Sequence, residues 1–212
     1  MNVVVASIPA FGHLNPMLPL VDAFVSQGDR VMVASGADMA DAAAAHGAAF
    51  HEACASEAVW FERLRARTRG APGDGLPAER INHYFVPRLF GEIGADDMVD
   101  GVLAACHEHR ADLVVYETYA LAAPLAAEVA GLPAAHHLIS PLLEDAVLEL
   151  TADAVTPLWR AMGRSGCPPY AGLYDGTTIA ITPPSLERRT VPRGQVMAMR
   201  PSPLPVSEGS TS

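Results

Sequence analysis

Apolar positions along the chain fall into two patterns, which predict two kinds of element. Short runs rich in Val, Ile and Ala are typical of buried strands, and apolar residues spaced three or four positions apart predict helices. The predicted strands cover residues 3–8, 31–34, 48–51, 112–116, 134–138 and 178–182, and the predicted helices cover 16–27, 37–46, 78–90, 96–109, 120–130 and 143–162. This alternation predicts an α/β fold, with a doubly wound, mostly parallel sheet and helices on both of its faces.

The segment between the third and fourth predicted strands is too long for a simple connection. Residues 56–110 carry helical spacing, beginning around Trp60, and are interrupted by the Gly- and Pro-rich stretch 70–77. We therefore expect a helical insertion between strands three and four, which in such folds often borders a ligand cleft. Residues 1–200 are predicted to form one domain, and the Pro- and Ser-rich residues 201–212 a linker or disordered tail.

The first predicted strand leads into a loop that holds one histidine. The loop reads Phe11-Gly12-His13 and is followed by Asn15-Pro16, where Asn is a favoured helix N-cap and Pro a favoured first-turn residue. We therefore expect His13 to lie between the carboxyl end of a strand and the amino end of a helix, where ligands bind in open α/β sheets. The helix dipole is expected to favour the neutral imidazole, which can accept a proton near neutral pH.

Two further predicted strands end in polar side chains. Residues 117–119 follow the fourth strand, and His136 and His137 end the fifth. Parallel strands leave the sheet at one edge, so these groups and His13 share one cleft if strands one, four and five are neighbours. His136 and His137 point to opposite faces of their strand, so we expect one of them, assigned as His137, to line the cleft.

A carboxylate beside a histidine suggests proton transfer. Glu117 could accept one ring N–H of His13, fix its tautomer and stabilise the imidazolium. The sequence has neither GxGxxG after the first strand nor GxxxxGK[ST], and it shows no activated Ser or Cys, so the nucleophile is expected to be a substrate hydroxyl. Three alternatives stay open: a His13 that only caps its helix, a Glu117 that is an ordinary loop carboxylate, and a metal site with His136, which no tight ligand spacing supports.

Composition and charge narrow the choice of partners and compartment. The formal net charge of −10 disfavours a nucleic acid or an anionic membrane as partner. The three cysteines Cys54, Cys106 and Cys167 form no CxxC pair, which favours a reducing cytosol over a disulfide framework or a zinc site. No signal peptide and no apolar run of membrane-spanning length is found, so we expect a cytoplasmic protein.

At this point the motifs resemble a known family. Residues 7–20, with Gly12-His13 and Asn15-Pro16 as their most specific part, are similar to the first βα loop of nucleotide-sugar-dependent glycosyltransferases of the GT-B fold. The likeness is to the bacterial natural-product type of the UDP-glycosyltransferase family, which acts on macrolides and aromatic polyketides. Residues 112–117, 125–127, 131–134, 183–186 and 199–201 resemble later parts of that family's N-terminal, Rossmann-like acceptor-binding domain.

The resemblance implies a role for several residues. His13 would be the general base that deprotonates an acceptor hydroxyl, which attacks the anomeric carbon of the nucleotide sugar and inverts it. Glu117 stands where the family often has Asp as the histidine's partner. The expected substrate-binding residues are Phe11, Gly12, Asn15, Trp60, Tyr84, Phe85, Thr118, Tyr119 and His137. Trp60, Tyr84 and Phe85 lie in the predicted insertion, and they could instead form the insertion's own core.

The sequence also departs from the family's pattern. The Gly-rich donor motif HxGxxGTxxE does not occur in these 212 residues. The resemblance therefore implies an acceptor-binding half without its C-terminal donor domain, with little transfer activity by itself. It further implies no metal or other cofactor, a nucleotide sugar as co-substrate, a hydrophobic aglycone as acceptor, and a homodimer as one possible assembly. A non-catalytic small-molecule binder or auxiliary protein is the alternative, with a hydrolase as a more distant one.

Overall fold

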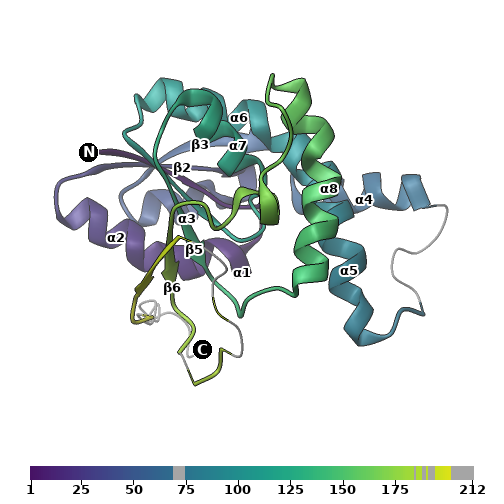
Figure 1. Ribbon diagram of the computed structural model, residues 1–212. Coiled ribbons are helices and arrows are strands. Elements are labelled where there is room, and N and C mark those ends of the chain that lie inside the picture. The colour runs from purple at the N-terminus through teal and green to yellow at the C-terminus, as the bar shows by residue number, and fades with distance from the viewer. Residues whose placement is uncertain (69–74, 184, 188–189, 191–193, 202–212) are drawn as a thin grey trace, which may run out of the picture.

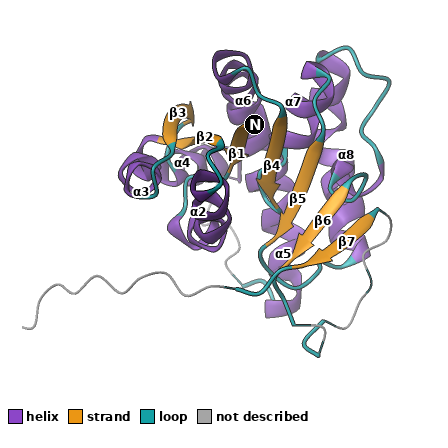
Figure 2. Ribbon diagram, turned by 90° about the vertical axis from the view of Figure 1, so that its left-hand side faces the viewer, coloured by secondary structure: helices purple, strands orange, loops and turns teal. Residues whose placement is uncertain are grey.

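The first strand of the chain lies inside the sheet, not at its edge. The computed structural model describes residues 1–68, 75–183, 185–187, 190 and 194–201. The strands in these ranges are β1 (Asn2–Ala6), β2 (Arg30–Gly36), β3 (Ala49–Cys54), β4 (Leu113–Glu117), β5 (Ala134–Leu138), β6 (Thr177–Ala180) and β7 (Gln195–Ala198). They form one sheet in the order β3-β2-β1-β4-β5-β6-β7, and every neighbouring pair is parallel. Figure 1 shows the sheet among its helices, and Figure 2 labels all of its strands.

Helices cover both faces of this sheet. They are α1 (Phe11–Leu14), η1 (Asn15–Met17), α2 (Leu18–Ser26), η2 (Ala37–Met39), α3 (Ala40–Ala45), α4 (Glu57–Thr68), η3 (Ala78–Arg80), α5 (Ile81–Phe85), η4 (Val86–Gly94), α6 (Ala95–His109), α7 (Ala122–Ala130), α8 (Asp145–Ala161) and η5 (Pro169–Gly172). Helices α6 and α7 lie on one face and α2 and α3 on the other (Figure 2). The predicted doubly wound α/β architecture is therefore confirmed, including strands one, four and five as neighbours.

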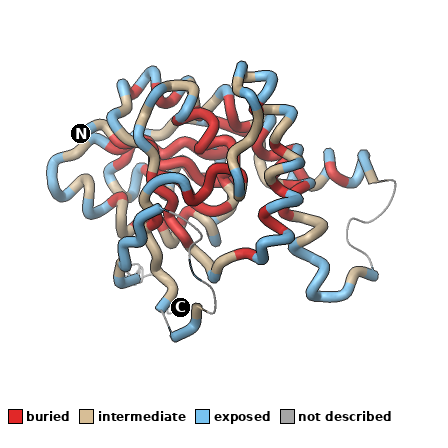
Figure 3. The backbone as a smooth tube through the Cα atoms, in the orientation of Figure 1, coloured by how far each residue is buried: buried red, intermediate tan, exposed pale blue. Residues whose placement is uncertain are grey.

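The continuous apolar run of β1 follows from its central place. Val4 and Ala6 pack into the core beneath α6 and α7, whereas Val3 and Val5 pack into the core beneath α2 and α3. A strand that is covered on both faces has no solvent side, so it needs no alternating polar residues. The buried residues accordingly run through the middle of the sheet (Figure 3).

The first helical run begins earlier than expected. Ala10 is its N-cap, with extended backbone at φ −142° and ψ 129°. Asn15 has helical dihedrals of φ −52° and ψ −42°, so the prediction that Asn15 caps the helix is wrong. Pro16 lies in the 3₁₀ turn η1, since proline cannot donate the bond that an α-helix would require there. His13 therefore lies in the first helical turn and not in a preceding loop.

The insertion is more continuous than the sequence suggested. Residues 78–109 form one helical run in which the π-helix η4 joins α5 to α6, whereas the prediction placed a break at residues 91–95. Gly91 and Gly94 lie in this region and allow close packing. A Cβ at Gly94 would lie 2.9 Å from the ring of Trp60, and one at Gly91 would lie 3.3 Å from Ala154 of α8. Together, α4, α5 and α8 gather at one end of the molecule (Figure 1).

The carboxyl-terminal part holds a strand that the sequence pattern did not predict. Strand β7 pairs with β6 at the open edge of the sheet, and all four of its residues are exposed. An exposed strand has no buried face, so it leaves no apolar period in the sequence. Of the predicted tail, residues 202–212 lie outside the described residues, as do residues 70–74 of the predicted loop.

Candidate functional site

His13 and Glu117 meet at the carboxyl edge of the sheet. His13 Nδ1 lies 3.1 Å from Glu117 Oε2. The His13 side chain is 22% exposed, and that of Glu117 is fully buried. With Nδ1 engaged by the carboxylate, Nε2 is the nitrogen that can face a substrate. The predicted pairing of these two residues is therefore present in the structure.

Backbone donors hold the carboxylate of Glu117 in place. The N–H of Ile8, just beyond β1, donates to Oε1 at 3.2 Å, and the N–H of Tyr119 donates to Oε2 at 2.8 Å. Glu117 is the last residue of β4, whereas the prediction placed it as the first residue of the exit loop. A buried carboxylate needs such partners, because water cannot solvate it there. The two backbone N–H donors therefore orient the carboxylate of Glu117, which in turn orients the ring of His13.

The charge on Glu117 sets the proton affinity of His13. Burial acts to lower the pKa of His13, but the hydrogen bond and charge of Glu117, together with the charge of Glu57, outweigh it and raise that pKa above 6.5. The prediction that the helix dipole keeps the imidazole neutral is therefore wrong in direction, because the negative charges of Glu117 and Glu57 favour the protonated form. A raised pKa makes His13 a stronger base once it is neutral.

Two aromatic rings flank His13. The Tyr119 ring meets it edge-on, with centroids 5.0 Å apart, and the Phe90 ring lies 6.2 Å away. Tyr119 and Phe90 contact each other at 4.9 Å. Tyr119 was expected from the exit of β4, whereas the sequence analysis missed Phe90 of η4 and Glu57 of α4. Counting on from Phe85 along an unbroken helical run could have drawn attention to Phe90.

The other predicted substrate-binding residues divide into two groups. Phe11 and Gly12 are exposed beside His13, and Asn15 is half-buried. Trp60 is fully buried and donates from Nε1 to Asp97, so it belongs to the core of the insertion and does not line an open pocket. Thr118 is buried as well, with its hydroxyl 3.1 Å from His136 Nε2.

The two histidines of β5 both lie inside the protein. His137 is fully buried in register with Glu117, and neither of its ring nitrogens has a hydrogen-bond partner. His136 stacks on Tyr116 on the other face of the sheet. Burial lowers the pKa of His137 to about 4, and burial with the neighbouring His137 lowers that of His136 to about 3. Both rings are therefore neutral at physiological pH, and His137 has no exposed surface with which to line a cleft.

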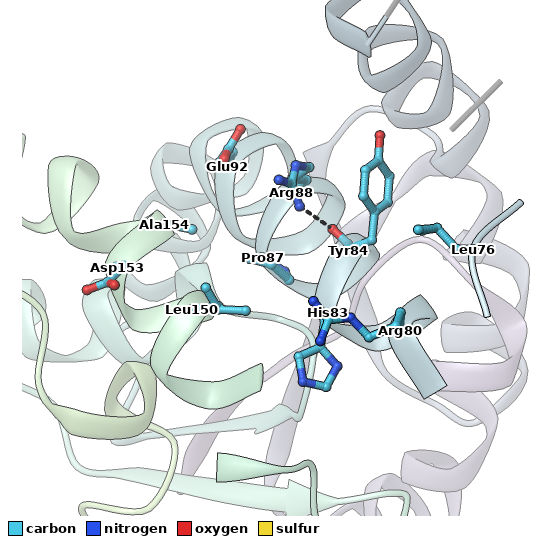
Figure 4. A pocket seen from close by; sticks show the side chains of 10 residues that line it. All are labelled: Leu76, Arg80, His83, Tyr84, Pro87, Arg88, Glu92, Leu150, Asp153 and Ala154. Atoms are coloured by element: carbon cyan, nitrogen blue, oxygen red, sulfur yellow. Dashed lines mark hydrogen bonds between the residues drawn. The ribbon is translucent and has the colours of Figure 1, made fainter. Parts of the chain in front are cut away.

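A cavity of about 560 Å³ opens between the insertion and α8. Tyr84 and His83 of α5 and Arg88 of η4 line one side, and Leu150 of α8 lies across from them (Figure 4). The Arg88 guanidinium lies 4.6 Å from the centre of the Tyr84 ring. The predicted residue Tyr84 thus faces a cavity, whereas Phe85 packs on Phe61 and Tyr84. Neither His13 nor Glu117 lines this cavity.

Among the described residues, no group of three or more His, Cys, Asp or Glu side chains is placed to hold a metal ion. The three cysteines are free thiols. In the same part of the chain, no helix has the length and apolar character needed to cross a bilayer.

Comparison with known proteins gives a consistent result. Residues 78–159 match the family described as erythromycin biosynthesis protein CIII-like, N-terminal domain. The chain is 29% identical over 156 residues to the 3-alpha-mycarosylerythronolide B desosaminyl transferase of Saccharopolyspora erythraea, an alignment that covers 66% of this chain and 37% of that protein.

Solved glycosyltransferases share the fold. SsfS6 of Streptomyces sp. SF2575 aligns with 99% of this chain at a TM-score of 0.76 and 23% identity. SnogD of Streptomyces nogalater aligns with all of it at 0.73 and 24% identity. The chain covers 57% and 54% of those two proteins, so it spans about half the length of the structures that it matches. These findings confirm the resemblance: the chain is similar to the N-terminal domain of natural-product glycosyltransferases of the GT-B fold.

Proposed function

We propose that this chain is the acceptor-binding half of an inverting glycosyltransferase. In this proposal a sugar passes from a nucleotide sugar to a hydroxyl group of a hydrophobic natural-product aglycone. The contact of 3.1 Å between His13 Nδ1 and Glu117 Oε2 carries the proposal, because it supplies an oriented base. The spinosyn rhamnosyltransferase SpnG, a structural neighbour, has been solved with thymidine diphosphate and with spinosyn aglycone, which supports both substrate classes.

The proposed reaction is one displacement at the anomeric carbon. His13 Nε2 takes the proton of the acceptor hydroxyl while its oxygen attacks that carbon. The bond from the anomeric carbon to the diphosphate breaks, and the nucleotide diphosphate leaves with the electron pair. The imidazolium keeps its Nδ1–H on Glu117, whose negative charge stabilises it. We further propose, from the resemblance to this family, that these steps take place without a metal ion.

The donor would be held outside this chain. The 212 residues contain no HxGxxGTxxE motif, so we propose that a C-terminal domain supplies the nucleotide-sugar site. By itself, the chain is then expected to bind aglycones but to transfer little sugar. The possible homodimer and the cytoplasmic location stay predictions from the sequence.

Reconstitution with a donor domain tests this function. The chain is joined to, or mixed with, the C-terminal domain of a related glycosyltransferase, and transfer is followed with nucleotide sugars and candidate aglycones. Loss of a positioned general base costs roughly a hundred- to ten-thousand-fold in rate, so His13→Ala is expected to lower kcat by that factor. A matched control is His107→Ala, at an exposed histidine of α6. Transfer that survives His13→Ala contradicts the proposal, and aglycone binding without any transfer favours a non-catalytic binder.

A further inference from the structure

Phe90 connects the insertion to the His13 site. It lies in η4, whereas His13 and Tyr119 belong to the carboxyl edge of the sheet. The three rings form a triangle, with centroids 6.2, 5.0 and 4.9 Å apart. In the described part of the chain, Phe90 is the insertion residue whose ring contacts His13.

The packing of the insertion determines where Phe90 lies. Gly91, the next residue, fits against Ala154 and Val155 of α8, and Gly94 fits against the ring of Trp60. A Cβ would lie 2.9 Å from the Trp60 ring at Gly94 and would make a tight contact of 3.3 Å with Ala154 at Gly91, so η4 packs closely against both α4 and α8. A π-helix inserts one extra residue into a helical turn and is often found where function requires an unusual side-chain direction.

One hydrogen bond alone does not fix an imidazole ring. The terminal torsion of histidine is broad, so the ring can turn while Nδ1 stays near an acceptor. Tyr119 constrains the ring from its edge, and its backbone also holds Glu117. Phe90 contacts the same ring and limits the approach of water to it, since both side chains are only partly exposed.

We propose that Phe90 is a positioning residue for the general base. It keeps His13 turned so that Nδ1 stays on Glu117 and Nε2 faces the acceptor hydroxyl. The orientation of the base thereby depends on how η4 is seated against α8 and α4. This inference rests on the proposed role of His13 in catalysis, but its structural part can be tested without any turnover.

The first experiment uses nuclear magnetic resonance on the chain itself. Exchange of the His13 Nδ1 proton with solvent is measured in the wild type, in Phe90→Ala and in Phe90→Tyr, with thermal unfolding recorded to show that each variant is folded. Opening one side of the ring to water is expected to speed exchange about tenfold or more in Phe90→Ala. Phe90→Tyr keeps the ring and is expected to exchange like the wild type.

A matched truncation elsewhere in the insertion separates positioning from general loosening. Phe85 contacts Phe61 and Tyr84, so Phe85→Ala removes a ring of equal size from the same helical run. We expect His13 exchange in Phe85→Ala to stay within a factor of about two of the wild type. Unchanged exchange in Phe90→Ala, or equal acceleration in Phe85→Ala, would overturn the proposal.

The second experiment uses the reconstituted two-domain protein. A misplaced base lowers the rate of the chemical step, so Phe90→Ala is expected to reduce kcat about tenfold to a hundredfold, with the KM for the nucleotide sugar unchanged. Phe90→Tyr is expected to restore kcat, and a rise in donor KM with normal kcat contradicts the proposal. If His13→Ala leaves transfer intact, the proposed function fails, and the exchange measurement still decides whether Phe90 orients the ring.

Discussion

His13 Nδ1 and Glu117 Oε2 lie 3.1 Å apart although 104 residues separate them in the sequence. The parallel pairing of β1 with β4 brings them together, since Val3 to Ala6 are in register with Leu113 to Tyr116. The N–H of Ile8, which follows β1, donates to the same carboxylate. The candidate site is therefore created by the order of the strands, and both partners depend on the central pair of the sheet.

The protonation of His13 provides the first test. Its pKa is raised, so we expect a nuclear magnetic resonance titration of the chain to give a midpoint above 6.5. Glu117→Gln removes the charge while burial remains, and its midpoint is expected below 6.5. Glu57→Gln should lower the midpoint by less, because Glu57 contributes less than Glu117.

The raised pKa of His13 determines how the stability of the fold and the activity of the reconstituted enzyme change with pH. The His13–Glu117 pair stabilises the fold below pH 6.5, and this contribution is lost as the pH rises through the pKa of folded His13. A general base must be neutral, so kcat/KM of the reconstituted enzyme is expected to increase with pH through that same pKa. A wild-type midpoint at or below 6.5 would contradict this account of the site.

Asp97 provides a test of how the insertion is attached. Its carboxylate accepts hydrogen bonds from the Ala55 N–H at 2.8 Å and Trp60 Nε1 at 2.9 Å, and it pairs with Arg63. Asp97→Ala leaves the buried indole N–H without a partner, so we expect a loss of about 3 kcal/mol in the free energy of unfolding. Denaturant titration measures this loss. Asp96→Ala, at an exposed neighbour, should cost less than about 1 kcal/mol.

Gly101 of α6 tests the contact between α6 and β3. In an exposed helix, alanine is favoured over glycine by about 1 kcal/mol. Here a Cβ would lie 2.2 Å from the carbonyl oxygen of Ala53, so Gly101→Ala is expected to destabilise the protein by about 3 kcal/mol instead. Gly12→Ala is the control, because a Cβ at this helical glycine meets nothing within 4 Å. Thermal unfolding that shows Gly101→Ala to be stabilising would exclude this close packing.

The buried histidines of β5 predict sensitivity to acid. Folded His136 and His137 have pKa values of about 3 and about 4, whereas the unfolded value is near 6.5. The unfolded chain therefore binds more protons as the pH falls, so each ring is expected to cost about 2 kcal/mol of stability between about pH 7.5 and about pH 5. Urea unfolding at several pH values measures this loss.

A variant isolates the contribution of one ring. His137→Leu removes two unpartnered buried nitrogens and is expected to halve the loss of stability on acidification. His107→Gln, at an exposed position of α6, should leave the pH dependence as in the wild type. An unchanged slope in His137→Leu would show that other groups cause the acid sensitivity.

The sequence was sufficient to predict the central strands of the sheet and the pairing of His13 with Glu117 at its carboxyl edge. Strand β5 was predicted with its observed bounds, because short apolar runs between helices admit few interpretations. His13 and Glu117 could be paired from the shared edge of parallel strands. The start of the first helix could not be predicted. Asn15 has a side chain that often caps helices, but the N-cap is Ala10, which makes no side-chain cap hydrogen bond.

Packing decided what the sequence pattern left open. Trp60 and Tyr84 looked alike as candidates for an aromatic pocket, yet one is buried against Gly94 and the other faces a cavity. The raised pKa of His13 is due mainly to Glu117, with a smaller contribution from Glu57, which no spacing rule connects to His13. Phe90 ended the predicted helix 78–90, but nothing in the sequence indicated that this end of the helix lies beside His13.

The central place of β1 has a consequence for how the protein is made. This strand is translated well before its partner β4, which begins only at Leu113. At about 5–20 residues per second, synthesis exposes one long edge of β1 in the nascent chain for roughly 5–20 seconds. During that interval His13 has been translated and Glu117 has not. The pair of His13 and Glu117 therefore assembles late, when more than half of the 212 residues have been translated.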